Sequence, residues 1–361
     1  MGCEVSWFAA LCDDDYEFLG VSEPALQSSW KHCRTIALAA EEAGYDNLLL
    51  PSGYAMGIDS VAFAAGIAPH LRRMQVLLAV RMSEMWPPQL ARQLATIDQM
   101  LGGRLTINII SSELPGEQLG SAARYRRTLE IMHVLRDLLD GKPVDVDGEF
   151  VRLTLDPPRV RPPGGCPPFY FGGLSEPARD VAARAADVYL MWPDTLAGVA
   201  AVVSDLRARA AGYGRTLRFG YRAHVIVRAT EAEAVVAAQR LLSRLDPEAG
   251  ERIRRRSLDT TSAGNARQSE LRTEAADDGY VEPNLWTGIG RARSGAGAAI
   301  VGDPDQVLAK LRAYQDLGLE AFILSGYPHA AEADLFARHV LPYLDHAPLL
   351  PRPPATKPAR A

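Results

Sequence analysis

The sequence predicts an α/β fold, a closed (β/α)8 barrel of the TIM type with insertions over the carboxyl ends of its strands. Along the 361 residues, short apolar runs alternate with longer amphipathic segments, which indicates strands joined by crossover helices. Two of these runs end in polar residues, at Arg222 and His224 and at residues 325–329. Sites in parallel α/β folds form at the carboxyl ends of strands, so both endings agree with one site at one end of a barrel.

Eight strands are expected, and helices follow them in order. The strands are predicted at residues 5–10, 47–50, 75–80, 105–110, 169–171, 188–191, 218–228 and 322–325. The helices are predicted at residues 28–44, 60–71, 88–101, 125–139, 176–186, 196–211, 231–243 and 304–317, and a further helix closes the chain. Gly102 and Gly103 follow the third helix, as is typical of a helix C-terminus.

Two insertions exceed what a minimal barrel needs. Residues 141–168 contain a hairpin-like segment at 144–151, and residues 247–297 form an irregular polar stretch. Both are predicted to lie as lids over the strand ends that carry the polar residues. Residues 1–346 are expected to form one barrel domain, and the Pro-rich residues 347–361 a disordered tail.

The composition argues against several classes of function. A formal net charge of −5 gives no broad attraction to nucleic acid or to an anionic membrane. The sequence begins without a signal-peptide pattern, and no run approaches the roughly 20 apolar residues of a membrane span. The four cysteines have no metal-binding or disulfide spacing; they are Cys3, Cys12, Cys33 and Cys166. We therefore expect a cytoplasmic protein without a metal site.

The seventh and eighth strands carry the strongest functional signal. Alternation along residues 218–228 places Arg222 and His224 on one face of a strand, where a buried polar pair is costly unless it meets partners or a ligand. The eighth strand ends in Ser-Gly and delivers Tyr327 and His329 to the same end of the barrel. Taken singly, Tyr327 could cap the barrel rim and His329 could be a satisfied loop histidine. Together the four side chains predict a site for a charged ligand.

An ordered series of motifs resembles the flavin-dependent alkanesulfonate monooxygenases of the bacterial luciferase superfamily. The motifs, spread over most of the chain, lie at residues 7–8, 104, 170–173, 189–192, 218–228, 283–288, 295–297, 301–303 and 324–329. The resemblance implies a barrel with an extra lid and a homodimer or homotetramer. It also implies reduced FMN from a separate NAD(P)H-dependent flavin reductase, dioxygen as cosubstrate, and a small-molecule sulfonate cleaved to an aldehyde and sulfite.

Carried over residue by residue, the resemblance assigns five catalytic side chains: Arg222, His224, Arg293, Tyr327 and His329. It implies that Arg222 stabilises anionic charge and is the best candidate for proton transfer, while Arg293 closes with a mobile loop. His224 and Tyr327 position Arg222 and the substrate. Arginine suits such a site because it keeps its proton in a place shielded from water.

The flavin site is expected where the fifth strand meets its helix. Gly172 and Gly173 end the strand, and the free backbone N–H groups and the Ser175 hydroxyl at the start of the helix could hold the FMN phosphate. Tyr125 is the expected side-chain partner of that phosphate. The remaining residues assigned to the flavin are Asn108, Trp192, Ser325 and Gly326.

The substrate side departs from the family pattern. The predicted pocket residues are Trp7, Cys12, Tyr54, Met56, Arg81 and Trp86. Cys12 replaces a histidine after the first strand, Tyr54 and Met56 stand in a segment that carries a cysteine in the family, and Glu84, Trp86 and Glu113 add acidic and aromatic surface. Asp13, Asp14 and Asp15 would form an anionic rim that repels a sulfonate. These changes favour a larger or partly cationic substrate over a simple alkanesulfonate.

Three other functions agree with parts of the pattern. They are a deazaflavin-dependent dehydrogenase, a flavin enzyme that performs Baeyer–Villiger or N-oxygenation chemistry, and a catalytically silent flavin-binding protein. The Arg-His strand and Arg293 argue against the first. The histidines outside the predicted site are interpreted as surface or packing residues; they are His32, His70, His133, His339 and His346.

Overall fold

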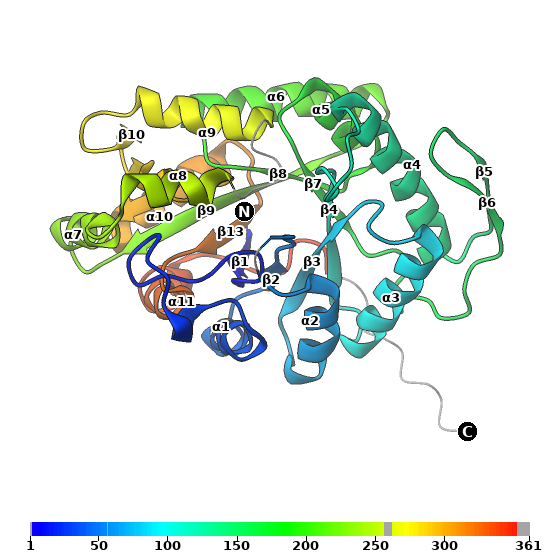
Figure 1. Ribbon diagram of the computed structural model, residues 1–361, viewed down its shortest axis with the longest axis horizontal. Coiled ribbons are helices and arrows are strands. Elements are labelled where there is room, and N and C mark those ends of the chain that lie inside the picture. Colours follow the sequence, from blue (N-terminus) through cyan, green and yellow to red (C-terminus); the bar gives the residue numbers. More distant parts are fainter. Residues whose placement is uncertain (1, 56, 256–261, 352–361) are drawn as a thin grey trace.

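The computed structural model describes residues 2–55, 57–255 and 262–351, in which eight parallel strands close into a barrel (Figure 1). In spatial order they are β9 (Arg218–Val227), β13 (Ala321–Ser325), β1 (Glu4–Phe8), β2 (Asn47–Leu50), β3 (Gln75–Arg81), β4 (Leu105–Ile110), β7 (Phe169–Gly172) and β8 (Val188–Met191). Residues 188–191 of β8 pair with residues 218–221 of β9 and close the ring. The predicted (β/α)8 barrel is confirmed; β1 differs most from its prediction, because it ends at Phe8 rather than at Ala10.

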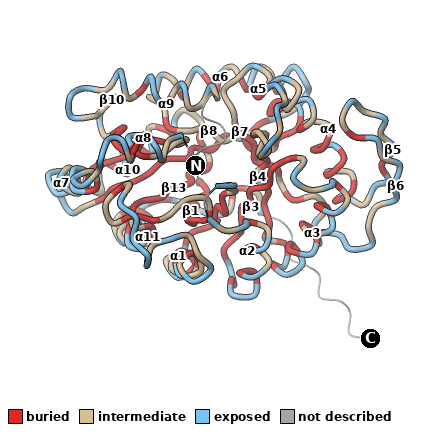
Figure 2. Tube along the Cα trace, in the orientation of Figure 1, coloured by how far each residue is buried: buried red, intermediate tan, exposed pale blue. Residues whose placement is uncertain are grey.

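Helices surround the barrel, and their outer faces are exposed while the strands are buried (Figure 2). They are α1 (Trp30–Ala43), α2 (Ser60–Ile67), α3 (Pro87–Met100), α4 (Ser121–Leu139), α5 (Glu176–Ala185), α6 (Leu196–Gly212), α7 (Glu231–Leu242), α10 (Pro304–Asp316) and α11 (His329–His339). Local sequence explains their ends. The Ser29 side chain accepts from the N–H of His32 at the start of α1, and Gly44 ends that helix with φ 89°. Asp303 and Gln306 form a capping box at the start of α10.

The two faces of β1 serve different layers. Trp7 points outward between the barrel and the helices, where its ring lies 5.1 Å from that of Tyr45 and its Nε1 donates to the carbonyl of His329 at 3.1 Å. Phe8 points into the barrel beside Leu49 and Tyr170. The prediction that Trp7 lines the substrate pocket is therefore corrected: alternation along the strand gives the inner position to Phe8.

The amino end of the barrel is closed by residues that follow α11. Leu349 is buried among inner barrel side chains, its N–H donates to Oε2 of Glu4 at 3.0 Å, and its carbonyl accepts from Arg218 at 3.0 Å. The prediction of a disordered tail from residue 347 is thus wrong for residues 347–351, because these contacts fix them. Residues 352–361 lie outside the described part of the chain.

The first insertion forms a hairpin of β5 (Val144–Asp147) and β6 (Arg152–Leu155). The Glu130 carboxylate of α4 accepts from the backbone N–H groups of residues 149–151, and Gln99 at the end of α3 donates to the carbonyl of Arg161. The hairpin stands beside α4 in Figure 1. The predicted position over the carboxyl ends of the strands is therefore wrong, because a segment that joins a helix to the next parallel strand lies at the amino ends.

The second insertion is not the irregular stretch that was predicted. Its described part contains α8 (Pro247–Arg255), α9 (Ala263–Glu274), β10 (Tyr280–Glu282) and β11 (Leu285–Trp286). β11 pairs antiparallel with β12 (Ala299–Gly302), and β12 pairs parallel with residues 224–227 of β9. Apolar periodicity could not show α9, because Gln268 and Leu271 are its buried residues. The insertion extends the sheet along the carboxyl half of β9, beside the predicted site.

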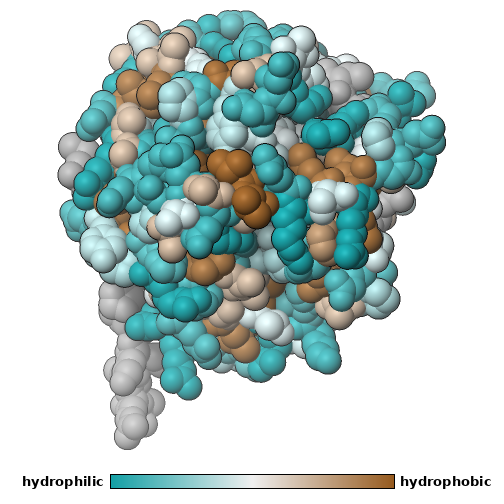
Figure 3. Space-filling model, turned by 90° about the vertical axis from the view of Figure 1, so that its left-hand side faces the viewer, coloured by the Kyte–Doolittle hydropathy of each residue, from teal (hydrophilic) through white to brown (hydrophobic). Residues whose placement is uncertain are grey.

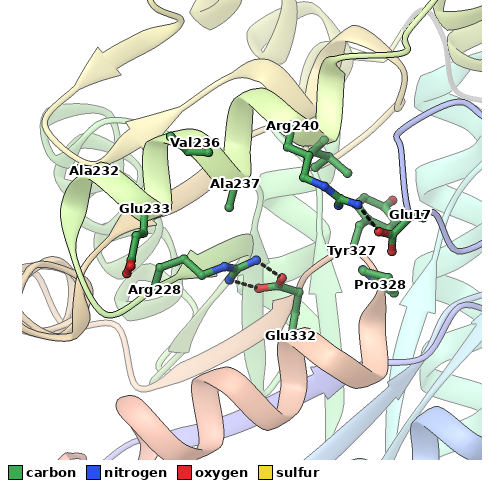
Figure 4. A pocket seen from close by; sticks show the side chains of 11 residues that line it. Glu17, Arg228, Ala232, Glu233, Val236, Ala237, Arg240, Tyr327, Pro328 and Glu332 are labelled. Atoms are coloured by element: carbon green, nitrogen blue, oxygen red, sulfur yellow. Dashed lines mark hydrogen bonds and ion pairs between the residues drawn. The ribbon is translucent and has the colours of Figure 1, made fainter.

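The outer surface over α7 and its neighbours is mostly hydrophilic, with apolar side chains in small patches (Figure 3). Val236 of α7 is an exposed apolar residue of this kind. Among the described helices, none combines the length and the apolar character needed to cross a lipid bilayer. No group of three or more His, Cys, Asp or Glu side chains in the described residues is arranged to hold a metal ion.

Candidate active site

Two arginine side chains lie over one aromatic ring at the carboxyl end of the barrel. Arg222 comes from β9, Arg293 from the second insertion, and Phe8 from the end of β1. The guanidinium carbon of Arg222 lies 4.3 Å from the centroid of the Phe8 ring, and that of Arg293 lies 5.2 Å from it. Both distances are typical of cation–π contacts, so Phe8 brings two positive charges to one place.

Arg222 is buried, and its charge is not paired. The residue is 5% exposed, and no carboxylate of the described residues forms an ion pair with it. Its Nη1 donates to the carbonyl of Ala223 at 2.6 Å, whereas its Nη2 has no hydrogen-bond partner within the described chain. Burial, and after it the charge of Arg293, lowers the pKa of Arg222 to about 9. Because an unpaired buried cation is costly, this end of the barrel is suited to receive an anion.

Arg293 is held by Tyr327. Its Nη1 donates to the Tyr327 hydroxyl at 2.6 Å and lies 4.0 Å from Oδ2 of Asp13. Although burial opposes its charge, Tyr327, Cys12 and Asp13 keep the pKa of Arg293 above its usual range. Burial raises the pKa of Tyr327 to about 12, although Arg293 acts in the opposite direction. The phenol therefore stays protonated, and its O–H can donate to a ligand.

His224 is a neutral buried imidazole. Its Nδ1 lies 2.9 Å from the Ser325 hydroxyl, and its ring stacks on Tyr327 at 5.2 Å. Burial, followed by the charges of Arg222 and Arg293, pushes the pKa of His224 well below its usual value. Its Nε2 has no hydrogen-bond partner among the described residues. Ser325, which was predicted to contact the flavin, forms a hydrogen bond with His224.

His329 meets Asp15, a residue that the sequence placed in the rim of the site but not among its catalytic groups. Its Nδ1 lies 2.8 Å from Oδ1 of Asp15, which is fully buried. The prediction of an anionic rim at the site mouth is therefore wrong for Asp15, because its carboxylate is buried against His329, the first residue of α11. His32, which was interpreted as a surface or packing residue, also reaches this carboxylate, with its Nε2 3.0 Å from Oδ2. Three carboxylates after a strand were the sequence signal, but nothing in the sequence indicated which one turns inward.

The loop after β2 packs on the loop after β1. Cys12 lies beside Arg293 and Arg222, and burial raises the pKa of its thiol although both arginines act in the opposite direction. A Cβ on Gly53 would lie 2.9 Å from the Cβ of Cys12, so the two loops touch here and glycine is needed. Tyr54 follows directly and is 67% exposed. Met56 lies outside the described residues.

Arg81 joins three loops at the same end of the barrel. Its guanidinium donates to the Ser112 hydroxyl after β4 and, at 3.2 Å, to the carbonyl of Ser52 after β2. Its Nε lies 3.4 Å from Oε1 of Glu84 after β3. Trp86, two residues further, is 54% exposed. The predicted substrate side thus consists of a buried arginine that ties the loops together and of aromatic side chains that face solvent.

The segment between β7 and α5 forms a cradle for an anion. Gly173 has φ 146°, and a Cβ there would lie 2.7 Å from the Cβ of Ala178 and 3.1 Å from the Tyr125 hydroxyl, so the segment requires glycine. Ser175 precedes α5, and its buried hydroxyl has no hydrogen-bond partner among the described residues. Helix N-termini leave backbone N–H groups free, and an orphan hydroxyl beside them fits a phosphate.

Comparison with known proteins identifies the family. Residues 18–321 match the family model described as luciferase-like monooxygenase. The chain belongs to this family. It is 63% identical over 355 residues to a sulfoquinovose monooxygenase of Novosphingobium aromaticivorans, covering 96% of this chain and 98% of the relative. It is 50% identical over 344 residues to a sulfoquinovose monooxygenase of Agrobacterium fabrum, covering 94% and 89%.

Solved structures agree with the fold of a luciferase-like monooxygenase. A riboflavin lyase with modified FMN and riboflavin aligns with a TM-score of 0.77 at 18% identity, over 95% of this chain and 91% of that chain. EDTA monooxygenase from Chelativorans sp. BNC1 aligns with a TM-score of 0.76 at 18% identity, over 95% and 93%. At 18% identity these structures show the shared barrel fold, whereas the family match and the two relatives indicate a monooxygenase. The resemblance to alkanesulfonate monooxygenases holds at the superfamily level.

The other three residues that were predicted to bind the flavin lie in different parts of the structure. Trp192 follows β8 and packs against the second insertion, where a Cβ on Gly264 would lie 2.8 Å from its ring. Asn108 shares the inner face of β4 with Thr106 and is half-buried. Gly326 lies close to α11, since a Cβ there would lie 2.4 Å from that of Glu332. Trp192 thus packs on the second insertion and Asn108 lies inside the barrel, whereas Gly326 allows a close contact with a helix.

Proposed function

We propose that this protein is a monooxygenase of a sulfonated sugar, with sulfoquinovose as substrate, reduced FMN as reductant and dioxygen as oxidant. The observation that carries the proposal is the pair of buried arginines over Phe8, of which Arg222 has no carboxylate partner among the described residues. A sulfonate is a compact anion that would complete this pair. The relatives that carry the name sulfoquinovose monooxygenase support the same substrate.

The proposed reaction converts the carbon that bears the sulfonate into an aldehyde. R–CH2–SO3⁻ reacts with reduced FMN and O2 to give R–CHO, HSO3⁻, oxidised FMN and water, which balances atoms, charge and electrons. Reduced FMN and O2 supply the electrons and the oxygen atom. Arg222 and Arg293 would bind the sulfonate and stabilise charge on the departing sulfite. The lowered pKa of Arg222 supports its expected part in proton transfer, and the Tyr327 hydroxyl would donate to the bound anion.

The sugar ring of the substrate would account for the loops after β2 and β3, which differ from the family pattern. A sugar presents hydroxyl groups that bind to carboxylates, and apolar C–H faces that stack on aromatic rings. Glu84, Trp86 and Tyr54 supply these groups on the loops after β3 and β2. The acidic and aromatic surface predicted from the sequence would therefore bind a neutral sugar ring, so the substrate is larger than a simple alkanesulfonate and need not be cationic.

The cofactor would bind with its phosphate in the cradle of Ser175, Gly173 and Tyr125 and its ring toward Trp192 and Asn108. A separate NAD(P)H-dependent reductase would supply it in reduced form. The four cysteines are free, as is usual in the reducing cytoplasm, where we place the reaction. We expect a homodimer or homotetramer, with residues 1–351 acting as one catalytic domain.

The test mixes the enzyme and anaerobically reduced FMN with oxygenated buffer that contains either sulfoquinovose or octanesulfonate, and measures sulfite after quenching. We expect sulfite with sulfoquinovose and at least tenfold less, about 1.4 kcal/mol in kcat/KM, with octanesulfonate. Preference for octanesulfonate would refute the sugar substrate. Oxidation of substrate without O2 would refute the monooxygenase reaction and favour a dehydrogenase.

A further inference from the structure

We propose that Asp15 is a positioning residue for His329: it holds the proton on Nδ1 and presents the bare Nε2 to the bound substrate. The inference concerns the catalytic cluster of the proposed function and rests on it for its effect on turnover. The arrangement of the two side chains can be tested without the reaction. Asp15 and His329 are far apart in the sequence, and they meet only because the barrel closes.

Asp15 is surrounded by donors. Its Oδ1 accepts from the backbone N–H of Tyr16 at 2.9 Å and from that of His329 at 3.1 Å, and lies 2.8 Å from Nδ1 of His329. Its Oδ2 lies 3.0 Å from Nε2 of His32. Although burial opposes ionisation, His329 and His32 hold the pKa of Asp15 below its usual range. The group is therefore a carboxylate, which can only accept hydrogen bonds.

This pairing determines the state of the His329 ring. Because an ionised carboxylate has no hydrogen to give, Nδ1 of His329 must carry one. In the neutral ring Nε2 is then left bare as the reactive atom, and it has no hydrogen-bond partner in the described part of the chain. The ring is 5.7 Å from Phe8 and 4.9 Å from Tyr327, and these two rings fix its plane. Nε2 is thus placed to accept a hydrogen bond or a proton from the substrate.

The second buried imidazole lacks this control. Nδ1 of His224 meets the Ser325 hydroxyl, which can either donate or accept, so the contact does not select a tautomer. His224 also faces the charges of Arg222 and Arg293, which oppose its protonation. Of the two histidines, His329 alone has a carboxylate partner among the described residues. The geometry therefore assigns proton acceptance to His329. His224 then lines the site as a neutral polar side chain.

The test follows the proton directly. Histidine labelled with 15N is incorporated into the full chain, and two-bond 1H–15N spectra report which ring nitrogen carries hydrogen. His329→Gln identifies the signal of His329 among the seven histidines. We expect the Nδ1–H form in the wild-type protein. An Nε2–H form there overturns the proposal, even if no variant of Asp15 folds.

Asp15→Leu is nearly isosteric and leaves no acceptor for Nδ1 of His329, whereas asparagine would keep its carbonyl oxygen at the position of Oδ1, which accepts from two backbone N–H groups. We expect the Nε2–H form to appear in Asp15→Leu, together with a loss of sulfite formation of about 10²–10⁴-fold in kcat, as the loss of the carboxylate causes in a Ser-His-Asp triad. Asp14→Asn is the control from the same loop. Asp14 accepts from the backbone of Ser28 at 2.9 Å, asparagine can keep that bond, and we expect kcat within about twofold of wild type.

The outcomes separate this inference from the proposed function. If Asp15→Leu keeps the Nδ1–H tautomer, or switches it without slowing sulfite release, the positioning role is wrong. If Asp14→Asn loses as much activity as Asp15→Leu, the loop matters as a whole and the specific role is also wrong. If the wild-type protein releases no sulfite from sulfoquinovose, the proposed function fails, while the spectra still decide whether Asp15 sets the tautomer.

Discussion

Both ends of the barrel bury charged groups, but the carboxyl end leaves one of them, Arg222, without a charged partner among the described residues. Glu4 is fully buried at the amino end, and its carboxylate accepts from Ser6, Asn47 and Tyr170 and from the backbone N–H of Leu349. At the carboxyl end, Arg222 and two histidines keep polar atoms without partners among the described residues. A buried ionisable group whose hydrogen bonds are complete is part of the fold, whereas one with unpartnered polar atoms marks where a ligand can bind.

A change at Arg222 is the strongest test of this difference between the two ends of the barrel. Arg222→Met should lower kcat/KM for sulfite release by about 10³-fold, because the anion loses a buried charge. The same change should leave the melting temperature equal or higher, because an unpaired buried cation destabilises the fold. Sulfite assays and thermal unfolding measure the two effects. A large drop in melting temperature would show that Arg222 is structural after all.

Glu4→Ala should have the opposite profile. It removes the acceptor of several buried donors, and we expect a loss of about 3 kcal/mol in the free energy of unfolding, measured with urea. Turnover at a temperature where the variant is folded should stay near that of wild type, because Glu4 lies at the far end from Arg222. A variant that folds normally but loses turnover would contradict the division between the two ends.

The pH dependence of Glu4 adds a second check. Burial raises the pKa of Glu4 in the folded protein above its unfolded value, although its hydrogen bonds act in the opposite direction. Its contribution to stability is therefore complete below about pH 4 and falls as pH rises through the folded pKa. The stability of the wild-type protein relative to Glu4→Gln, which does not titrate, should decline over that range. If the stability of the wild-type protein relative to Glu4→Gln instead increased with pH, the raised pKa of Glu4 would be contradicted.

Ser175 tests the cradle for the cofactor. Its buried hydroxyl lacks a partner among the described residues, so Ser175→Ala should cost the protein little stability. A lost hydrogen bond to a charged phosphate is worth about 2 kcal/mol, and we expect reduced FMN to bind roughly 30-fold more weakly. Anaerobic titration of flavin fluorescence measures this. Thr195→Ala is a suitable control, because Thr195 caps α6 in the corresponding place and already accepts from Gly198.

Trp86 should show the smallest effect. An exposed aromatic ring that stacks on a sugar contributes about 1 kcal/mol, so Trp86→Ala should raise the KM for sulfoquinovose roughly fivefold and leave kcat unchanged. Octanesulfonate, which has no sugar ring, provides the control. An equal rise of KM for both substrates would place Trp86 outside the sugar site.

The comparison of the two ends also shows which predictions the sequence could support. β9 was predicted with Arg222 and His224 on one face, because alternation is a local property of a strand. The hairpin of residues 144–155 was placed at the wrong end, because local pattern does not say on which side of the barrel a connection lies. Phe8 and Asp15 were missed for a related reason: their roles depend on partners far away in the sequence.

The sequence by itself determined the order of the eight barrel strands and the helices around them, the end of α3 at Gly102 and the polar face of β9, since each follows from neighbouring residues. The tertiary structure alone decided that Asp15 meets His329, 314 positions away, and that Phe8 lies beneath two arginines from separate elements. It also decided that Leu349 closes the amino end of the barrel. Barrel closure is the physical reason, because it brings the ends of all strands together and turns distant residues into neighbours.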